Sequence, residues 1–136
     1  MLERFSISLE EELLRAFDRF LKKHGYSNRS EGVRDLIRQS LVVEEWDENE
    51  VVVGVISLVF NHHQRLLQEK ITKLQHDFHH LISSTTHVHL DHDNCLEVII
   101  TRGAAGRIKS LTDRLSALRG VKNCSLSTTS TGKHLH

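Results

Sequence analysis

Imidazole and thiol side chains are concentrated in the middle of this 136-residue chain. Eight of its 11 histidines fall between residues 62 and 92. Within that stretch His87 and His89 are two residues apart, and Cys95 follows after five intervening residues. Imidazole and thiolate are the ligands that zinc, nickel and copper prefer in proteins. The spacing therefore predicts a transition-metal site that includes His87, His89 and Cys95.

Alternating polar and apolar residues place these three ligands on a hairpin of two strands, 83–91 and 95–101. Residues two apart on a strand share a face, so His87 and His89 point the same way. A three-residue turn at 91–93 puts His89 opposite Cys95 and His87 opposite Glu97, whereas a two-residue turn divides the set between faces. We expect the odd turn, with Glu97 beside His87 as a carboxylate that orients the imidazole.

The apolar residues of the same hairpin occupy its other face: Val88, Leu90, Leu96, Val98 and Ile100. We expect that face to be the one covered by helices. A fourth ligand must come from elsewhere, and the helix expected at 62–81 offers His76, His79 and His80. Zinc would complete a tetrahedron, whereas Ni(II) or Cu(II) would prefer a planar arrangement, and the spacing alone leaves these choices open.

The elements around the hairpin follow the order βαββαβ. Strands are expected at 51–60, 83–91, 95–101 and 121–129, and helices at 62–81 and 104–119. This order is the ferredoxin-like pattern, in which helices cover one face of an antiparallel sheet. The other face is expected to meet another subunit, and the remaining histidines His62, His63, His79, His80, His134 and His136 have no role fixed by spacing.

Residues 1–43 are expected to form a strand followed by two helices. Polar residues Arg4, Ser6 and Ser8 alternate with Phe5, Ile7 and Leu9. The first helix is closed by Gly25, and the second opens with Asn28 and Glu31 as a capping box. A lone strand with an apolar face needs a partner, so we expect two chains to pair their strands as an antiparallel ribbon.

The segment Arg4-x-Ser6-x-Ser8, together with Tyr26-Ser27-Asn28-Arg29-Ser30-Glu31, resembles ribbon-helix-helix repressors. The resemblance implies that the ribbon carrying Arg4, Ser6 and Ser8 reads the major groove of double-stranded DNA. Helix N-termini suit phosphates, so Asn28, Arg29 and Ser30 are expected at the DNA backbone. An ordinary exposed strand face is the alternative interpretation of the three strand residues.

The run Gln75-His76, followed by His87-Val88-His89-Leu90-Asp91-His92-Asp93-Asn94-Cys95-Leu96-Glu97, resembles the nickel-responsive transcriptional repressors. The resemblance implies a homotetramer with ACT-like regulatory domains, in which Ni(II) acts as corepressor at a palindromic operator of nickel-uptake genes. It implies nickel ligands His87, His89 and Cys95 of one subunit with His76 of a neighbour. It also implies a second cation site at Glu31 and Asp35, and a nonspecific DNA contact at Arg65, beside which position 64 is Gln.

Charge and composition complete the predicted organisation. Residues 44–60 carry five acidic and no basic side chains, and we expect an acidic linker at 46–50 between a ribbon-helix-helix domain at 1–45 and the ACT-like domain at 51–136. The predicted class is α+β. No apolar run has the roughly 20 residues of a membrane helix. No signal peptide is visible, and two cysteines are too few for a disulfide scaffold, so we expect a cytoplasmic location.

Three alternatives remain from the residues alone. A His2Cys site can be catalytic, as in zinc deaminases, but the His-x-Glu and Pro-Cys-x-x-Cys patterns are missing and the chain has no proline, so we do not expect an enzyme. A regulator that senses an amino acid through its ACT-like domain would leave the three metal ligands without a role. A zinc- or copper-responsive regulator of the same architecture is the third alternative.

Overall fold

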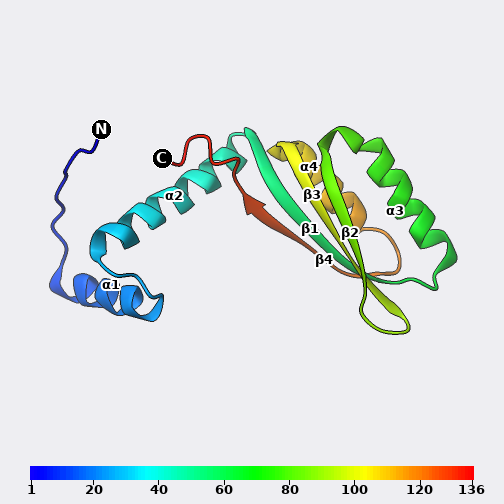
Figure 1. Cartoon of the computed structure of the whole chain (residues 1–136), viewed down its shortest axis with the longest axis horizontal. Helices are drawn as coiled ribbons and strands as arrows, with labels where there is room; N and C mark the ends of the chain where they lie inside the picture. The colour runs from blue at the N-terminus through cyan, green and yellow to red at the C-terminus, as the bar shows by residue number, and fades with distance from the viewer. The chain divides into compact units, whose positions relative to one another are not determined.

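The N-terminal unit of the protein contains one whole helix and the first part of a second. A computed structural model describes residues 1–136 and divides the chain into two compact units, residues 1–40 and 41–136 (Figure 1). Helix α1 spans Glu11–Lys23 and helix α2 spans Arg29–Asp47. The side chain of Leu21 is buried against Gly32, where any larger residue would collide with it. The predicted cap is confirmed, because the Glu31 amide donates to Asn28 Oδ1 at 2.9 Å.

Residues 1–10 form neither helix nor strand in the single chain. The predicted strand is therefore not present, and the physical reason is that a strand needs a hydrogen-bonding neighbour, which one chain does not supply. The apolar side of the alternation still lies toward the helices: Phe5, Ile7 and Leu9 line an apolar hollow together with residues such as Leu13 and Phe17. Phe5 nevertheless keeps 72% of its surface exposed.

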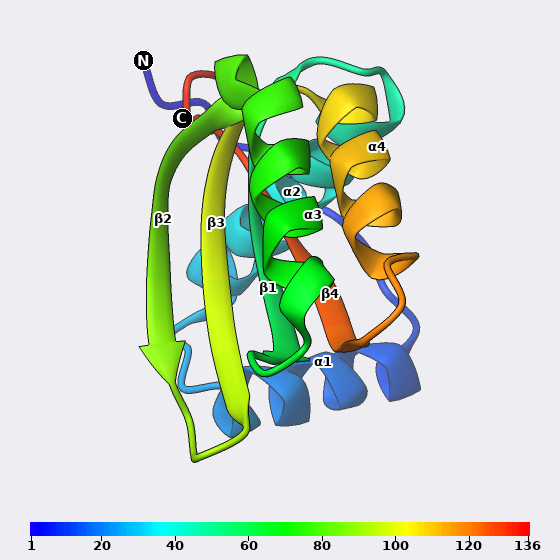
Figure 2. The ribbon, with the colours of Figure 1, turned by 90° about the vertical axis from the view of Figure 1, so that its right-hand side faces the viewer.

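The second unit is a four-stranded antiparallel sheet with two helices. Its elements are β1 (Val51–Asn61), α3 (Arg65–Asp77), a 3₁₀ turn η1 (His79–Leu81), β2 (Ile82–His89), β3 (Asn94–Ala104), α4 (Ala105–Ser116) and β4 (Val121–Thr129). The strand order is β2-β3-β1-β4. Helices α3 and α4 both lie over one face of the sheet (Figure 2). The predicted βαββαβ order and the α+β class are confirmed.

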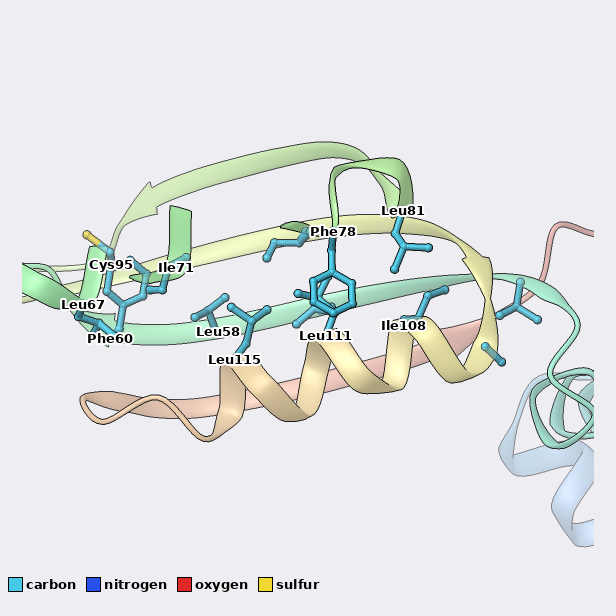
Figure 3. Packing of buried hydrophobic residues seen from close by; sticks show 14 of the residues in the cluster. Leu58, Phe60, Leu67, Ile71, Phe78, Leu81, Cys95, Ile108, Leu111 and Leu115 are labelled. Carbon is cyan, nitrogen blue, oxygen red and sulfur yellow. The ribbon is translucent and has the colours of Figure 1, made fainter. Parts of the chain in front are cut away.

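The core of this unit lies between the sheet and the two helices. Every second residue of β1, from Val52 to Phe60, is buried. The helices add Leu67 and Ile71 from α3, and Ile108, Leu111 and Leu115 from α4 (Figure 3). Burial of apolar surface at about 25 cal/mol per Å² is what holds the helices on the sheet.

The covered face of the hairpin is the opposite of the one expected. Cys95, Glu97 and Ile99 are buried on the helix side, whereas Val88 and Ile100 are 40% and 39% exposed on the open side. Register places Val88, Leu96 and Val59 side by side across three strands of that open face. The alternation of residues shows which side chains share a face. Because β3 carries apolar residues on both faces, the alternation could not show which of the two faces the helices cover.

The helix expected at 62–81 is shorter than predicted at both ends. Asn61 Oδ1 accepts a hydrogen bond from the His63 amide at 2.8 Å, and the Gln64 amide bonds the Asn61 carbonyl at 3.2 Å. These bonds hold residues 61–64 in a turn, which is a frequent role of asparagine. At the other end α3 stops at Asp77, and the buried Phe78 separates it from the 3₁₀ turn.

The acidic segment is helical as far as Asp47, where α2 ends. Trp46 is only 5% exposed, packs in the core of the sheet unit, and donates its indole N–H to the Thr129 carbonyl at 2.8 Å. Glu45 is also buried and accepts a hydrogen bond from the Ser130 hydroxyl at 3.0 Å. The two compact units divide between residues 40 and 41, inside α2.

Candidate metal centre and DNA-binding unit

The β2–β3 hairpin has the register that the ligand argument required. His89 pairs with Cys95 and His87 pairs with Glu97. The turn is closed by the Leu90 amide, which donates to the Asn94 carbonyl at 2.9 Å. Asp91 Oδ1 accepts from the Asn94 amide at 2.8 Å. The predicted three-residue turn is thus confirmed, and all four side chains fall on one face of the sheet.

Cys95 is the buried thiol of this face. Its Sγ lies 3.4 Å from His89 Nδ1. Burial raises the pKa of the Cys95 thiol, and the negative charges of Asp91 and Glu97 raise it further. Asp91 stays ionised to lower pH than usual, because hydrogen bonds from Asn94 lower its pKa. A thiolate in these surroundings needs a neighbouring cation, so the donor set fits a bound divalent metal ion.

A histidine that the spacing did not single out joins this pair. The ligand atoms of His62, His89 and Cys95 all lie within 4.8 Å of one another. His87 is next to them, with its ring centroid 5.3 Å from that of His89 and 6.1 Å from that of Phe60. His62 was missed because it follows β1 directly, and only the pairing of Asn61 with Asn94 brings it to the hairpin.

Glu97 is buried beside this cluster, and only one of its two carboxylate oxygens has a hydrogen-bond partner. Its side chain is 7% exposed, its Oε1 accepts a hydrogen bond from Gln75 Nε2 at 3.0 Å, and its Oε2 has no partner. Gln75 directly precedes His76 on α3. The end of that helix is therefore attached to the strand that carries Cys95.

His76 does not reach the other predicted ligands within one chain. It lies exposed in the last turn of α3, its ring 5.8 Å from that of His79, beside a shallow groove lined by Gln68, Glu69, Thr72 and Lys73. His79 and His80 are exposed next to it. The structure thus brings together His89, Cys95 and His62, with His87 and Glu97 adjacent, and does not bring His76 to them within one chain.

The residues expected at DNA are exposed. Arg4, Ser6 and Ser8 lie in the N-terminal segment, and Ser30 lies in the first turn of α2. Arg29 is engaged within the unit, because its Nε and one terminal nitrogen each donate to Asp18 at 3.0 Å. Arg65 is exposed at the first position of α3, in the other unit.

The acidic pair expected at a second cation site lines one hollow of the N-terminal unit. Glu31 and Asp35 lie there with Tyr26, Arg34 and Arg38. Tyr26 donates its hydroxyl to Asp35, and this bond raises the pKa of Tyr26. Gln39 donates to the same carboxylate at 3.2 Å.

None of the helices in either unit has the length and apolar character needed to cross a membrane.

Two family models match the chain, one in its N-terminal part and one in the sheet unit. A ribbon-helix-helix protein model of the copG family matches residues 3–42, and the NikR C terminal nickel binding domain matches residues 53–129. Together they define the class of the protein, a transcription regulator with a DNA-binding unit and a nickel-binding unit. It is not an enzyme.

Full-length relatives carry both parts. A protein described as a nickel-responsive regulator in Desulfotalea psychrophila is 59% identical over 136 residues, covering 100% of both chains. One so described in Syntrophus aciditrophicus is 50% identical over 130 residues, covering 96% of this chain and 95% of the other. The chain belongs to the family of nickel-responsive regulators. A solved uncharacterized protein from Thermotoga maritima matches with TM-score 0.53 and 14% identity, over 58% of this chain and 98% of that one, which concerns the fold alone.

Proposed function

We propose that this regulator represses nickel-uptake genes, with Ni(II) as corepressor at a palindromic operator. The observation that carries the proposal is the pairing of His89 with Cys95, whose Nδ1 and Sγ lie 3.4 Å apart. A regulator that is activated by nickel and blocks nickel entry closes a negative feedback loop. Because such a regulator acts on chromosomal DNA, the proposal places it in the cytoplasm.

Nickel is proposed to be held by His87, His89 and Cys95 of one subunit and by His76 of a neighbouring subunit. The first three share a face of the hairpin, and His76 is exposed on α3, where a second subunit can reach it. One thiolate and three imidazoles provide four ligands of the kinds that suit Ni(II) in a planar arrangement. The nickel-binding family match does not support the alternatives of an amino-acid sensor or a zinc-responsive protein.

We propose a homotetramer, formed as a dimer of dimers through the ACT-like sheet units, because each unit leaves one apolar surface uncovered. In the N-terminal unit it is the segment with Phe5, Ile7 and Leu9, which can pair with its own copy as a ribbon. In the sheet unit it is the open face around Leu96, Val98 and Ile100. Two different isologous contacts on one chain generate a closed tetramer with twofold symmetry.

The DNA contacts are proposed to follow the ribbon-helix-helix arrangement. Arg4, Ser6 and Ser8 would reach base edges in the major groove, and the start of α2 at Asn28, Arg29 and Ser30 would lie on phosphates. Arg65 would add a nonspecific phosphate contact. Glu31 and Asp35 are proposed as the second cation site, which would neutralise two carboxylates close to the DNA-binding helix.

The test measures operator binding with and without Ni(II). Cys95→Ala and His76→Ala should each abolish nickel-dependent binding while the tetramer survives, and both should lose the planar nickel–thiolate absorbance. His79→Ala is the matched control, because His79 is exposed one turn from His76 and should affect neither measurement. Nickel-dependent binding that persists in the Cys95 variant would refute the proposed switch.

A further inference from the structure

A second group of metal-ligand side chains lies outside the proposed nickel ligands. His63, His92 and Asp93 come from two turns that are far apart in sequence, the β1–α3 turn and the β2–β3 turn. Their ligand atoms all lie within 4.8 Å of one another. None of the three residues belongs to the cluster around Cys95.

Hydrogen bonds hold the two turns together. The His62 amide donates to the Asp93 carbonyl at 3.0 Å, and the His63 amide donates to the Asn61 side chain at 2.8 Å. On the other turn, the Asp93 amide donates to Asp91 Oδ1 at 2.9 Å. The backbone positions of His63 and Asp93 are therefore fixed before any ion binds, which lowers the entropy cost of assembling a site.

Electronegative atoms converge on the ring of His63. Its Nε2 lies 3.0 Å from the His92 carbonyl oxygen and 3.4 Å from Asp93 Oδ1. A carbonyl and a carboxylate can only accept hydrogen bonds, so both face the proton on that nitrogen. A metal cation can take the place of the proton and bind the nitrogen and the oxygen atoms directly.

The set of donors indicates the class of ion. Two imidazoles and one carboxylate form a ligand set that suits borderline divalent transition metals, and it contains no thiolate. His63 and Asp93 have side chains that are 49% and 59% exposed, so water can fill the remaining coordination positions. Such a site should bind more weakly than one that includes a buried thiolate.

We propose that His63, His92 and Asp93 form a peripheral site for a divalent transition-metal ion, separate from the site that contains Cys95. The ring of His62 lies next to both, with centroids 4.0 Å from His63 and 5.7 Å from His89. The peripheral site fills after the thiolate site as the free metal concentration rises. It does not depend on His76 or on a neighbouring subunit.

The test counts Ni(II) ions bound to the full-length protein by equilibrium dialysis and metal analysis, while the nickel–thiolate absorbance reports the site with Cys95. The parent should take up a second ion per chain after that absorbance has saturated. His63→Ala and Asp93→Asn should each remove the second ion and leave the absorbance unchanged. His80→Ala is the matched control, since His80 is exposed but belongs to neither group, and it should keep both ions.

A Cys95→Ala variant separates this proposal from the proposed function. In that variant the absorbance is lost, but one ion should still bind and should disappear when His63→Ala is added. The proposal is overturned if the parent takes up no ion beyond the thiolate site at saturating nickel. It is equally overturned if both His63→Ala and Asp93→Asn retain the second ion.

Discussion

The hydrogen bond of 3.0 Å from Gln75 Nε2 to Glu97 Oε1 joins the end of helix α3 to the strand that carries Cys95. It connects the residue next to His76 with the residue opposite His87. The second oxygen of Glu97 is buried without a partner, a costly arrangement unless positive charge arrives nearby. In the proposed tetramer this bond therefore connects two different nickel sites, the one that uses this chain's Cys95 and the one that uses its His76.

Glu97→Gln should weaken nickel binding by about 10-fold, because it removes a carboxylate beside a ligating imidazole while its amide oxygen can still accept from Gln75. Competition with a chelator of known affinity measures the change. Asp113→Asn is the control, since Asp113 is an exposed carboxylate on α4 away from the proposed ligands, and it should bind nickel like the parent. Equal affinities of the Glu97 variant and the parent would make Glu97 a structural residue only.

Arg4→Ala should cost about 1–3 kcal/mol of operator binding if Arg4 reads a base edge. Binding to unrelated DNA should fall far less, because a base contact contributes only to the specific complex. The comparison of both affinities at one salt concentration measures the effect, and unchanged nickel–thiolate absorbance shows that the sheet unit is intact. If the affinities for operator and for unrelated DNA fell equally, Arg4 would contact a phosphate rather than a base.

Val98→Lys should dissociate the proposed tetramer into dimers. Val98 lies on the open face, paired with Ser57 and Thr86, where a lysine is tolerated in a free unit but is buried without a partner in an interface. Sedimentation velocity measures the mass. Ser110→Lys, at an exposed position of α4, should leave the tetramer unchanged. If the Val98 variant remains a tetramer, the subunit interface lies on a surface other than this open face.

The bond between Arg29 and Asp18 predicts an acid-sensitive N-terminal unit. Arg29 holds the pKa of Asp18 below its ordinary value of 3.8, first by hydrogen bonding and then by charge. The stabilising contribution is therefore complete above that value and is lost as the pH falls through the lowered pKa. Asp18→Asn should unfold at a slightly lower temperature than the parent at neutral pH, because it loses this ion pair.

Thermal unfolding of both chains between about pH 2 and 7 checks this expectation. The difference between parent and Asp18→Asn should shrink toward the acid end, where the parent's Asp18 is protonated as well. A difference that stays constant over the whole range would show that charge on Asp18 contributes nothing.

Much of the fold could be predicted from local pattern. The order of elements in the second unit, the cap at Asn28 and the odd turn between His89 and Cys95 all depend on residues close in sequence. The site required longer-range information. His62 joins Cys95 only because β1 and β3 pair in a particular register, and no local pattern reveals that register.

The prediction of the covered face failed for a related reason. Strand β3 offers an apolar side with Leu96 and Val98, and the helices instead cover the side with Cys95 and Glu97. The choice depends on β1 and on α4, whose large buried residues lie on that side. The strand expected at Arg4–Leu9 could not form in one chain, because its hydrogen-bonding neighbour is a second molecule.

Trp46 has a practical consequence for dividing this protein into independently studied fragments. A fragment that starts at the first strand, residue 51, lacks the indole that fills the space above Gly54, where Trp46 approaches to 3.0 Å of a hypothetical Cβ. Deleting a buried tryptophan typically costs about 3–5 kcal/mol, a large share of the stability of a small domain. A fragment intended for metal titration should therefore start at residue 41 or earlier, so that it retains the last part of α2 together with Trp46.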